Sequence, residues 1–256
     1  MKRLVVAYIV TLHLVVGGML WKSDFLDRVN SRLGLIEQLP KPEISEYYHR
    51  ILRYHERSVD SVPDDSVIFI GDSITQGLCV SAVQPNAVNF GIGSDTTTGV
   101  LMRIPAYMPA LERAKCIVLA IGVNDIHYRT AADALHNYAK ILDMLPQDRR
   151  VIVSAILPIG ETARQALDDR LAWIHEFNSG LKQLASDREL ASFMDNDAAL
   201  DTDGDNRLDK SFDDGDGVHL NSAGNLAWAA DMRDAIRRNE TAEHIHLQGL
   251  DSALLF

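Results

Sequence analysis

Five short apolar runs, each separated from the next, constrain the fold of this chain more than any other feature. The runs lie at residues 66–70, 86–90, 116–121, 150–156 and 190–194. Helical patterns fall between or after them, near residues 96–112, 131–145, 162–187 and 222–238. Strands that alternate with helices favour right-handed crossovers and a parallel sheet covered on both faces. We therefore predict an α/β fold, a three-layer αβα sandwich around a five-stranded parallel sheet.

The N-terminal segment, residues 1–21, differs in composition from the rest of the chain. Lys2 and Arg3 precede an apolar stretch from Leu4 to Trp21, which is close to the roughly 17–25 residues that cross a bilayer. Basic residues before such a span favour a cytoplasmic N-terminus. We expect an uncleaved membrane anchor, with a cleaved signal peptide as the alternative, and a domain facing the periplasm or the cell exterior. Cleavage would make the domain a secreted one.

After this segment the chain divides into a spacer, one main domain and a tail. Residues 22–42 form a predicted linker that ends in Pro40-Lys41-Pro42, where a helix cannot easily continue. The main domain is expected over residues 43–239 and opens with a helical pattern that ends near Ser58. Residues 240–256 lack clear periodicity, so we predict a loosely attached C-terminal tail.

Composition narrows the class of partner. The 256 residues carry a formal net charge of −11 and no cluster of lysine and arginine, which disfavours a nucleic-acid partner. The two cysteines, Cys79 and Cys116, are too few for a disulfide framework. We therefore expect two buried free thiols, with a single bridge between them as the alternative.

Polar side chains follow the predicted strands at the points where each strand ends. Ser73 comes directly after the first strand, the glycine-rich residues 89–96 come at the end of the second, and Asn124 follows the third. Asp216 and His219 lie just before the last predicted helix. The carboxyl ends of parallel strands share one edge of a sheet, so these residues can converge although they are distant in sequence.

The residue types at this edge suit acyl transfer. A serine hydroxyl needs a base, an orienting carboxylate and donors for the oxyanion before it acts as a nucleophile at neutral pH. Each feature alone has a structural explanation, such as a turn, a glycine loop or a capping asparagine. Their joint occurrence at successive strand ends favours a single acyl-transfer site.

Residues 66–236 resemble the GDSL or SGNH hydrolases. The resemblance is carried by four blocks: Gly71-Asp72-Ser73-Ile74, residues 89–96, Gly122-x-Asn124-Asp125 and Asp216-x-x-His219. It implies a flavodoxin-like SGNH fold, with no metal and no cofactor. It also implies that Ser73 is the nucleophile, His219 the general base and Asp216 the partner that orients the imidazole.

The resemblance implies three oxyanion donors: the Ser73 N–H, the Asn124 side-chain amide and one N–H of the loop at residues 89–96. The family usually has glycine where this chain has Ser94. The Ser94 N–H can serve if the loop avoids a positive φ there; otherwise Gly93 supplies the donor. The loop is especially similar to the branch that holds the catalytic subunits of platelet-activating-factor acetylhydrolase.

The predicted function is that of a serine esterase acting through an acyl-enzyme. Its expected substrates are small-acyl esters of sugars or envelope polymers, or lysophospholipids. An acyltransferase on the same residues is one alternative. Another is a non-catalytic envelope module that binds a ligand or calcium through the acidic residues 201–216.

The acidic segment begins like a calcium loop at Asp201. However, Asn206 stands where such a loop has glycine, and Phe212 stands where it has glutamate. We therefore predict an acidic surface loop rather than a metal site.

Overall fold

The computed structural model describes residues 2–22, 43–161 and 167–253. The chain divides into two compact units, Met1–Pro42 and Glu43–Phe256. The predicted linker lies outside the described residues except for Lys22, and so does the end of the predicted tail, residues 254–256.

The first unit contains helix α1 (Lys2–Lys22), which coincides with the predicted anchor segment. Among the described residues, however, we find no helix that combines the length and the apolar character needed to cross a membrane. The prediction that this segment anchors the chain in a membrane is therefore unsupported.

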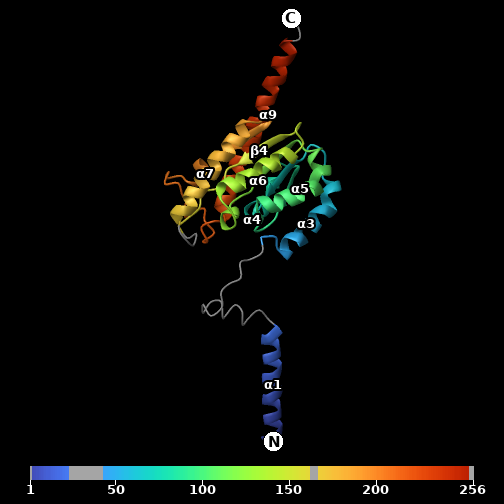
Figure 1. Cartoon of the computed structure of the whole chain (residues 1–256), viewed down its shortest axis with the longest axis vertical. Helices are drawn as coiled ribbons and strands as arrows, with labels where there is room; N and C mark the ends of the chain where they lie inside the picture. Colours follow the sequence, from blue (N-terminus) through green and yellow to red (C-terminus); the bar gives the residue numbers. More distant parts are fainter. Residues whose placement is uncertain (1, 23–42, 162–166, 254–256) are drawn as a thin grey trace. The chain divides into compact units, whose positions relative to one another are not determined.

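The second unit is built on a parallel sheet of five strands (Figure 1). They are β1 (Val67–Gly71), β2 (Ala87–Gly91), β3 (Cys116–Ala120), β4 (Arg150–Ser154) and β5 (Ala191–Met194), in the spatial order β2-β1-β3-β4-β5. All four neighbouring pairs are parallel. The predicted five-stranded parallel sheet is thus confirmed, and its strand order is the flavodoxin-like one.

The fourth strand is shorter than predicted. It ends at Ser154 rather than at residue 156. The main chain of Ile156 is taken out of the sheet by the Asn178 side chain, whose oxygen accepts the Ile156 N–H at 2.8 Å and whose nitrogen donates to the Ile156 carbonyl at 3.1 Å. An amide side chain here replaces the ladder partners that a further strand residue would need.

Five longer helices surround the sheet. They are α3 (Glu46–Ser58), α5 (Thr97–Leu111), α6 (Ala131–Met144), α7 (Leu167–Ser186) and α9 (Ser222–Ala253). Short elements connect them: η1 (Val59–Ser61), α4 (Ser73–Gly77), η2 (Val80–Ala82), η3 (Asp125–His127) and α8 (Asp197–Leu200). The start of α7 was predicted at residue 162, and residues 162–166 lie outside the described part.

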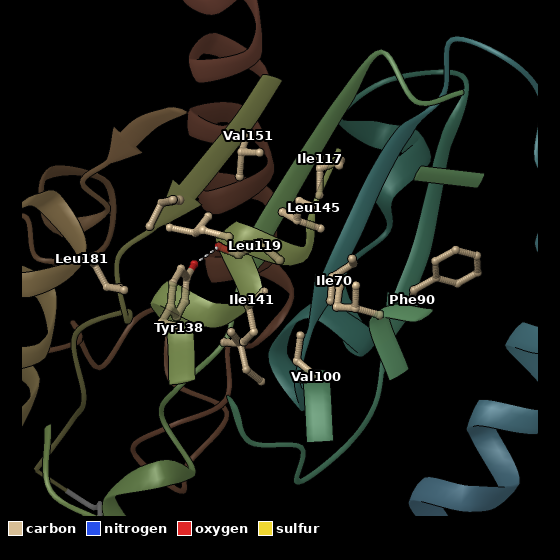
Figure 2. Packing of buried hydrophobic residues seen from close by; sticks show 14 of the residues in the cluster. Ile70, Phe90, Val100, Ile117, Leu119, Tyr138, Ile141, Leu145, Val151 and Leu181 are labelled. Carbon is tan, nitrogen blue, oxygen red and sulfur yellow. Dashed lines mark hydrogen bonds between the residues drawn. The ribbon is translucent and has the colours of Figure 1, made fainter. Parts of the chain in front are cut away.

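The two faces of the sheet pack into separate hydrophobic clusters. Successive side chains of a strand point to opposite faces, and in β1 Ile68 and Ile70 enter one cluster while Val67 and Phe69 enter the other. The first cluster is filled by α5, α6 and α7, as the packing around Tyr138 in Figure 2 shows. The second is filled mainly by α9. The three-layer αβα sandwich is therefore confirmed.

The last helix is longer than predicted. The sequence pattern placed its end at residue 238 and a tail after it, but α9 continues to Ala253. Residues 239–253 contain no proline and consist largely of residues that tolerate a helix. Helix propensity therefore extends α9 beyond the part with apolar periodicity.

Candidate active site

Ser73 is placed at the sheet edge by the turn from β1 into α4. Asp72 caps this short helix, since its carboxylate accepts the Ile74 N–H at 3.0 Å. Gly71 is required by close packing, because a Cβ there would lie 2.4 Å from the Ala120 carbonyl oxygen. Burial raises the pKa of Asp72 to about 7, and the hydrogen bond from Ile74 offsets this only in part. A buried carboxyl group thus lies directly beside the candidate nucleophile.

Three of the predicted residues form a hydrogen-bonded series. The Ser73 Oγ lies 2.9 Å from the His219 Nε2, and the His219 Nδ1 lies 2.6 Å from the Asp216 Oδ2. With the proton on Nδ1, the imidazole donates to Asp216 and accepts from the serine hydroxyl at Nε2. Ser73 and His219, 146 positions apart in the chain, are thus in contact.

The Asp216 carboxylate also organises the segment that carries it. Its Oδ1 accepts the main-chain N–H groups of Val218 at 2.9 Å and His219 at 2.8 Å. Partial burial opposes ionisation, but these bonds and the one from the imidazole outweigh it and hold the pKa of Asp216 below its ordinary value. The group is therefore a carboxylate at neutral pH, as an orienting partner must be.

A second carboxylate, that of Asp213, holds the same segment. Asp213 Oδ1 accepts the N–H groups of Gly215 at 2.8 Å and Gly217 at 2.9 Å. The Gly160 N–H, after β4, donates to the Gly217 carbonyl at 2.8 Å. The loop that presents Asp216 and His219 is thus tied to the sheet by main-chain contacts. Sequence reasoning missed Asp213, because an aspartate in an acidic run carries no distinguishing pattern.

The loop after β2 presents two consecutive N–H groups of different status. The Gly93 N–H donates to the Gln76 Oε1 at 2.8 Å. The Ser94 N–H has no hydrogen-bond acceptor within the described ranges. Ser94 has a φ of +61°, so the condition under which its N–H was expected to serve, a loop without a positive φ there, is not met. The Gly93 N–H, which was the alternative, is already engaged, so the Ser94 N–H is the unengaged one of the two.

The Asn124 amide uses one of its two hydrogens to hold this loop. Its Nδ2 donates to the Asp95 carbonyl at 3.0 Å, and an amide nitrogen has two hydrogens. The neighbouring Asp125 carboxylate accepts the N–H of Thr97 at 2.9 Å and its hydroxyl at 2.5 Å. The residues that follow β3 therefore hold the segment that follows β2 in place.

A buried ion pair supports the loop after β2, residues 92–96, from inside the domain. Asp95 and Arg103 meet at 2.8 Å with both side chains fully buried. Arg103 also donates to the Phe90 carbonyl at 2.6 Å and the Gly71 carbonyl at 2.9 Å. One guanidinium thus links the ends of β1 and β2. A lone arginine among apolar residues in the predicted helix was the available signal for it.

The acidic segment forms a cluster of carboxylates. The carboxylates of Asp201, Asp203 and Asp209 lie within 4.8 Å of one another. Asp201 accepts the N–H groups of three following residues, and Asn206 adopts a φ of +63° in the turn. The turn shape of a calcium loop is therefore present without its glycine.

Two cavities lie near the sheet edge. One of about 20 Å³ is lined by Asp72, Ile74 and Trp228, among others, immediately behind the nucleophile turn. A larger one of about 710 Å³ lies over the ends of β4 and β5 against α7, and its lining includes neither Ser73 nor His219. The His219 and Asp216 side chains are 43% and 55% exposed, so the reactive edge is open to water.

Both cysteines are free thiols, as predicted, but only Cys116 is buried; the expectation of burial is wrong for Cys79, which is exposed.

The site thus combines a serine hydroxyl hydrogen-bonded to an imidazole, which is in turn bonded to a carboxylate, at one edge of a parallel sheet. This arrangement is the one that defines the class of serine hydrolases. The model of the GDSL-like lipase/acylhydrolase family matches residues 69–227. The chain belongs to this family, and the resemblance seen in the four sequence blocks is confirmed. The family is described as one of lipases and acylhydrolases.

The curated relatives include subunits of platelet-activating factor acetylhydrolase. Subunit alpha2 of the IB enzyme from Homo sapiens is 34% identical over 126 residues, covering 44% of this chain and 53% of that protein. Subunit alpha1 from Rattus norvegicus is 32% identical over 118 residues, covering 43% and 50%. The chain thus spans about half the length of the curated relatives it matches.

Solved structures extend the likeness over more of the domain. A Streptococcus pneumonia protein provisionally described as a platelet activating factor superposes with a TM-score of 0.67 at 27% identity, covering 74% of this chain and 92% of that one. A GDSL-like lipase from Bacteroides thetaiotaomicron gives a TM-score of 0.63 at 20% identity, covering 75% and 99%. The second comparison supports the fold.

Proposed function

We propose that this chain hydrolyses small-acyl carboxylic esters through an acyl-enzyme on Ser73. The observation that carries the proposal is the series from Ser73 Oγ to His219 Nε2 at 2.9 Å and from His219 Nδ1 to Asp216 Oδ2 at 2.6 Å. In this proposal Ser73 is the nucleophile, His219 the general base and Asp216 the group that holds the imidazole tautomer.

The reaction proceeds in two halves. His219 takes the hydroxyl proton as the Ser73 Oγ attacks the ester carbonyl carbon, and the carbonyl oxygen becomes an oxyanion. The bond to the alcohol oxygen then breaks, and His219 returns the proton to the leaving alcohol. A water molecule, deprotonated by His219, attacks the acyl-enzyme and releases the carboxylic acid and the free serine.

Three donors are proposed for the oxyanion: the Ser73 N–H, the Ser94 N–H and the second hydrogen of the Asn124 amide. The Ser94 N–H has no competing acceptor within the described residues, whereas the Gly93 N–H is engaged by Gln76. Loss of one such donor typically lowers turnover by roughly 100-fold to 1000-fold.

The proposed acyl group is small, and the proposed acceptor is water. The support for a small acyl group is that the curated relatives are acetylhydrolase subunits. With the His219 side chain 43% exposed, water reaches the base directly, which favours hydrolysis over transfer to another alcohol. The proposed alcohol part is a sugar, an envelope polymer or a lysophospholipid.

The test is a chain-length series of nitrophenyl esters on the full chain, with a fluorophosphonate probe to count reactive sites. We expect fastest turnover of the acetyl ester and one adduct on Ser73, both abolished by Ser73→Ala. The exposed Ser81→Ala serves as a matched control that keeps both. Ester hydrolysis unchanged by Ser73→Ala would contradict the mechanism.

We further propose that the domain works outside the cytoplasm. Lys2 and Arg3 precede the apolar residues of α1, the order found in exported proteins. Fusions to alkaline phosphatase and to a fluorescent protein that matures only in the cytoplasm test this, since we expect activity only from the phosphatase fusion.

A further inference from the structure

Gln76 lies one helical turn after Ser73 and reaches the loop on the other side of the candidate site. Its Oε1 accepts the Gly93 N–H at 2.8 Å. The contact is tight, because a Cβ on Gly93 would lie 3.0 Å from this oxygen and 3.9 Å from the Ser73 Cβ. Gln76 therefore bridges the helix of the proposed nucleophile and the loop of the proposed oxyanion donor.

Tyr47 contacts both polar atoms of the Gln76 amide. The Gln76 Nε2 donates to the Tyr47 hydroxyl at 2.8 Å, and that hydroxyl also lies 3.1 Å from the Gln76 Oε1. The Tyr47 ring also closes the space beside Gly93, since its Cε1 would lie 3.3 Å from a Cβ there. With the amide nitrogen held by a tyrosine of α3, the amide oxygen faces the Gly93 N–H.

This arrangement decides which N–H of the loop is available. Gly93 and Ser94 offer consecutive N–H groups, and Gln76 occupies the first. The second has no acceptor in the described part of the chain. On the far side the loop is held independently by Asp95, through Arg103 and Asn124. Gln76 is thus the side chain that fixes the near side.

We infer that Gln76 is a positioning residue that engages Gly93 so that Ser94 donates to the oxyanion. The inference rests on the proposed esterase function and adds to it a residue that touches neither the substrate nor the reacting atoms. It requires that loss of the Gln76 oxygen lowers kcat without weakening ground-state binding, because an oxyanion donor acts in the transition state.

The test compares three replacements of Gln76 in the full chain. Gln76→Met keeps the length and removes the acceptor. Gln76→Glu keeps an oxygen for the Gly93 N–H and a second oxygen to which the Tyr47 hydroxyl can donate. Gln76→Asn keeps the amide but withdraws it by one methylene. Gln183→Met, on the exposed surface of α7, is the matched control.

We expect Gln76→Met and Gln76→Asn to lower kcat per fluorophosphonate-reactive site by roughly 10-fold to 100-fold, somewhat less than the loss of a whole donor. KM should stay within about 2-fold, because the replacements leave the contacts that bind the substrate in its ground state unchanged. Gln76→Glu should restore kcat to within about 3-fold, and Gln183→Met should leave it unchanged. Counting reactive sites corrects for any unfolded fraction.

The failures are distinguishable. A wild-type chain that neither hydrolyses esters nor labels on Ser73 overturns the proposed function. An active wild type whose Gln76→Met and Gln76→Asn variants keep kcat overturns the role of Gln76, and so does a change confined to KM. If Gln76→Met does not fold, Gln76→Asn alone decides by the same criterion.

Discussion

The two sides of the candidate site are built in opposite ways. On the side of the proposed oxyanion donors, Asp95, Arg103 and Asp125 are almost completely buried. Arg103 forms an ion pair with Asp95, and the Asp125 carboxylate accepts the Thr97 N–H. On the acid–base side Asp216 and His219 are about half exposed and held mainly by main-chain hydrogen bonds. The difference shows that the residues supporting the proposed oxyanion donors are buried in the domain, whereas the proposed proton-transfer pair lies at the surface.

Because one side of the site is buried and the other exposed, substitutions on the two sides should affect stability differently. A buried charged group that loses its partner destabilises the fold, while an exposed pair contributes little to it. Substitutions on the acid–base side should therefore remove activity from a folded protein, and those on the oxyanion side should affect both.

The largest expected effect is that of His219→Ala. It removes the proposed base, so kcat should fall by about 10⁴-fold or more. The side chain is 43% exposed, so Tm should stay within a few degrees. Ester hydrolysis and a thermal melt measure the two quantities, with the exposed His136→Ala as control. A large fall in Tm would break the comparison.

Arg103→Met should destabilise the protein most. It leaves the Asp95 carboxylate buried without its partner and frees two strand-end carbonyls, a loss of roughly 3–5 kcal/mol. Urea unfolding measures it. Arg113→Met, whose side chain is 37% exposed and paired with Asp64, should cost no more than about 1 kcal/mol. Equal losses in the two variants would show that burial does not set the difference.

Asp72→Asn should change the pH dependence of stability. The folded pKa of Asp72 is raised to about 7, so its contribution to stability is present at acidic pH and is lost as the pH rises through 7. Asparagine keeps the cap on Ile74 without titrating. Relative to wild type, the variant should therefore gain ~3 kcal/mol between pH 4.5 and pH 8.

Urea unfolding at both pH values tests this, with the exposed Asp64→Asn as control. A difference between variant and wild type that is the same at both pH values would contradict the assignment of the raised pKa to Asp72.

The smallest expected effect is that of Ser94→Gly. Glycine adopts a positive φ without the penalty of about 1 kcal/mol that a side chain incurs, although it also adds entropy to the unfolded chain. Stability should change by less than about 1 kcal/mol, and kcat should stay within roughly 3-fold because the N–H survives. A loss of kcat comparable to that of Asn124→Ala would instead assign a role to the serine side chain.

The sequence predicted the sheet and the convergent residues because both depend on local patterns. Short apolar runs defined the strands, and Ser73 and Asn124 follow the ends of β1 and β3 within four residues. Contacts between distant segments could not be predicted from local patterns. Gln76 meets Gly93 only after the first βαβ unit has closed. Similarly, β4 ends where the Asn178 side chain, from α7, bonds the main chain of Ile156. The φ of Ser94 was equally inaccessible, since serine residues seldom adopt it.

The separation of Ser73 from His219 by 146 positions also has a consequence for biosynthesis. The nucleophile, the oxyanion loop and strands β1 to β3 all lie before residue 126, and chains emerging from the ribosome fold from the N-terminal end. The proposed base, His219, is synthesised after all five strands of the sheet. A nascent or truncated chain that ends before residue 216 therefore carries Ser73 without its proposed base, and reactivity toward esters would report that synthesis has passed His219.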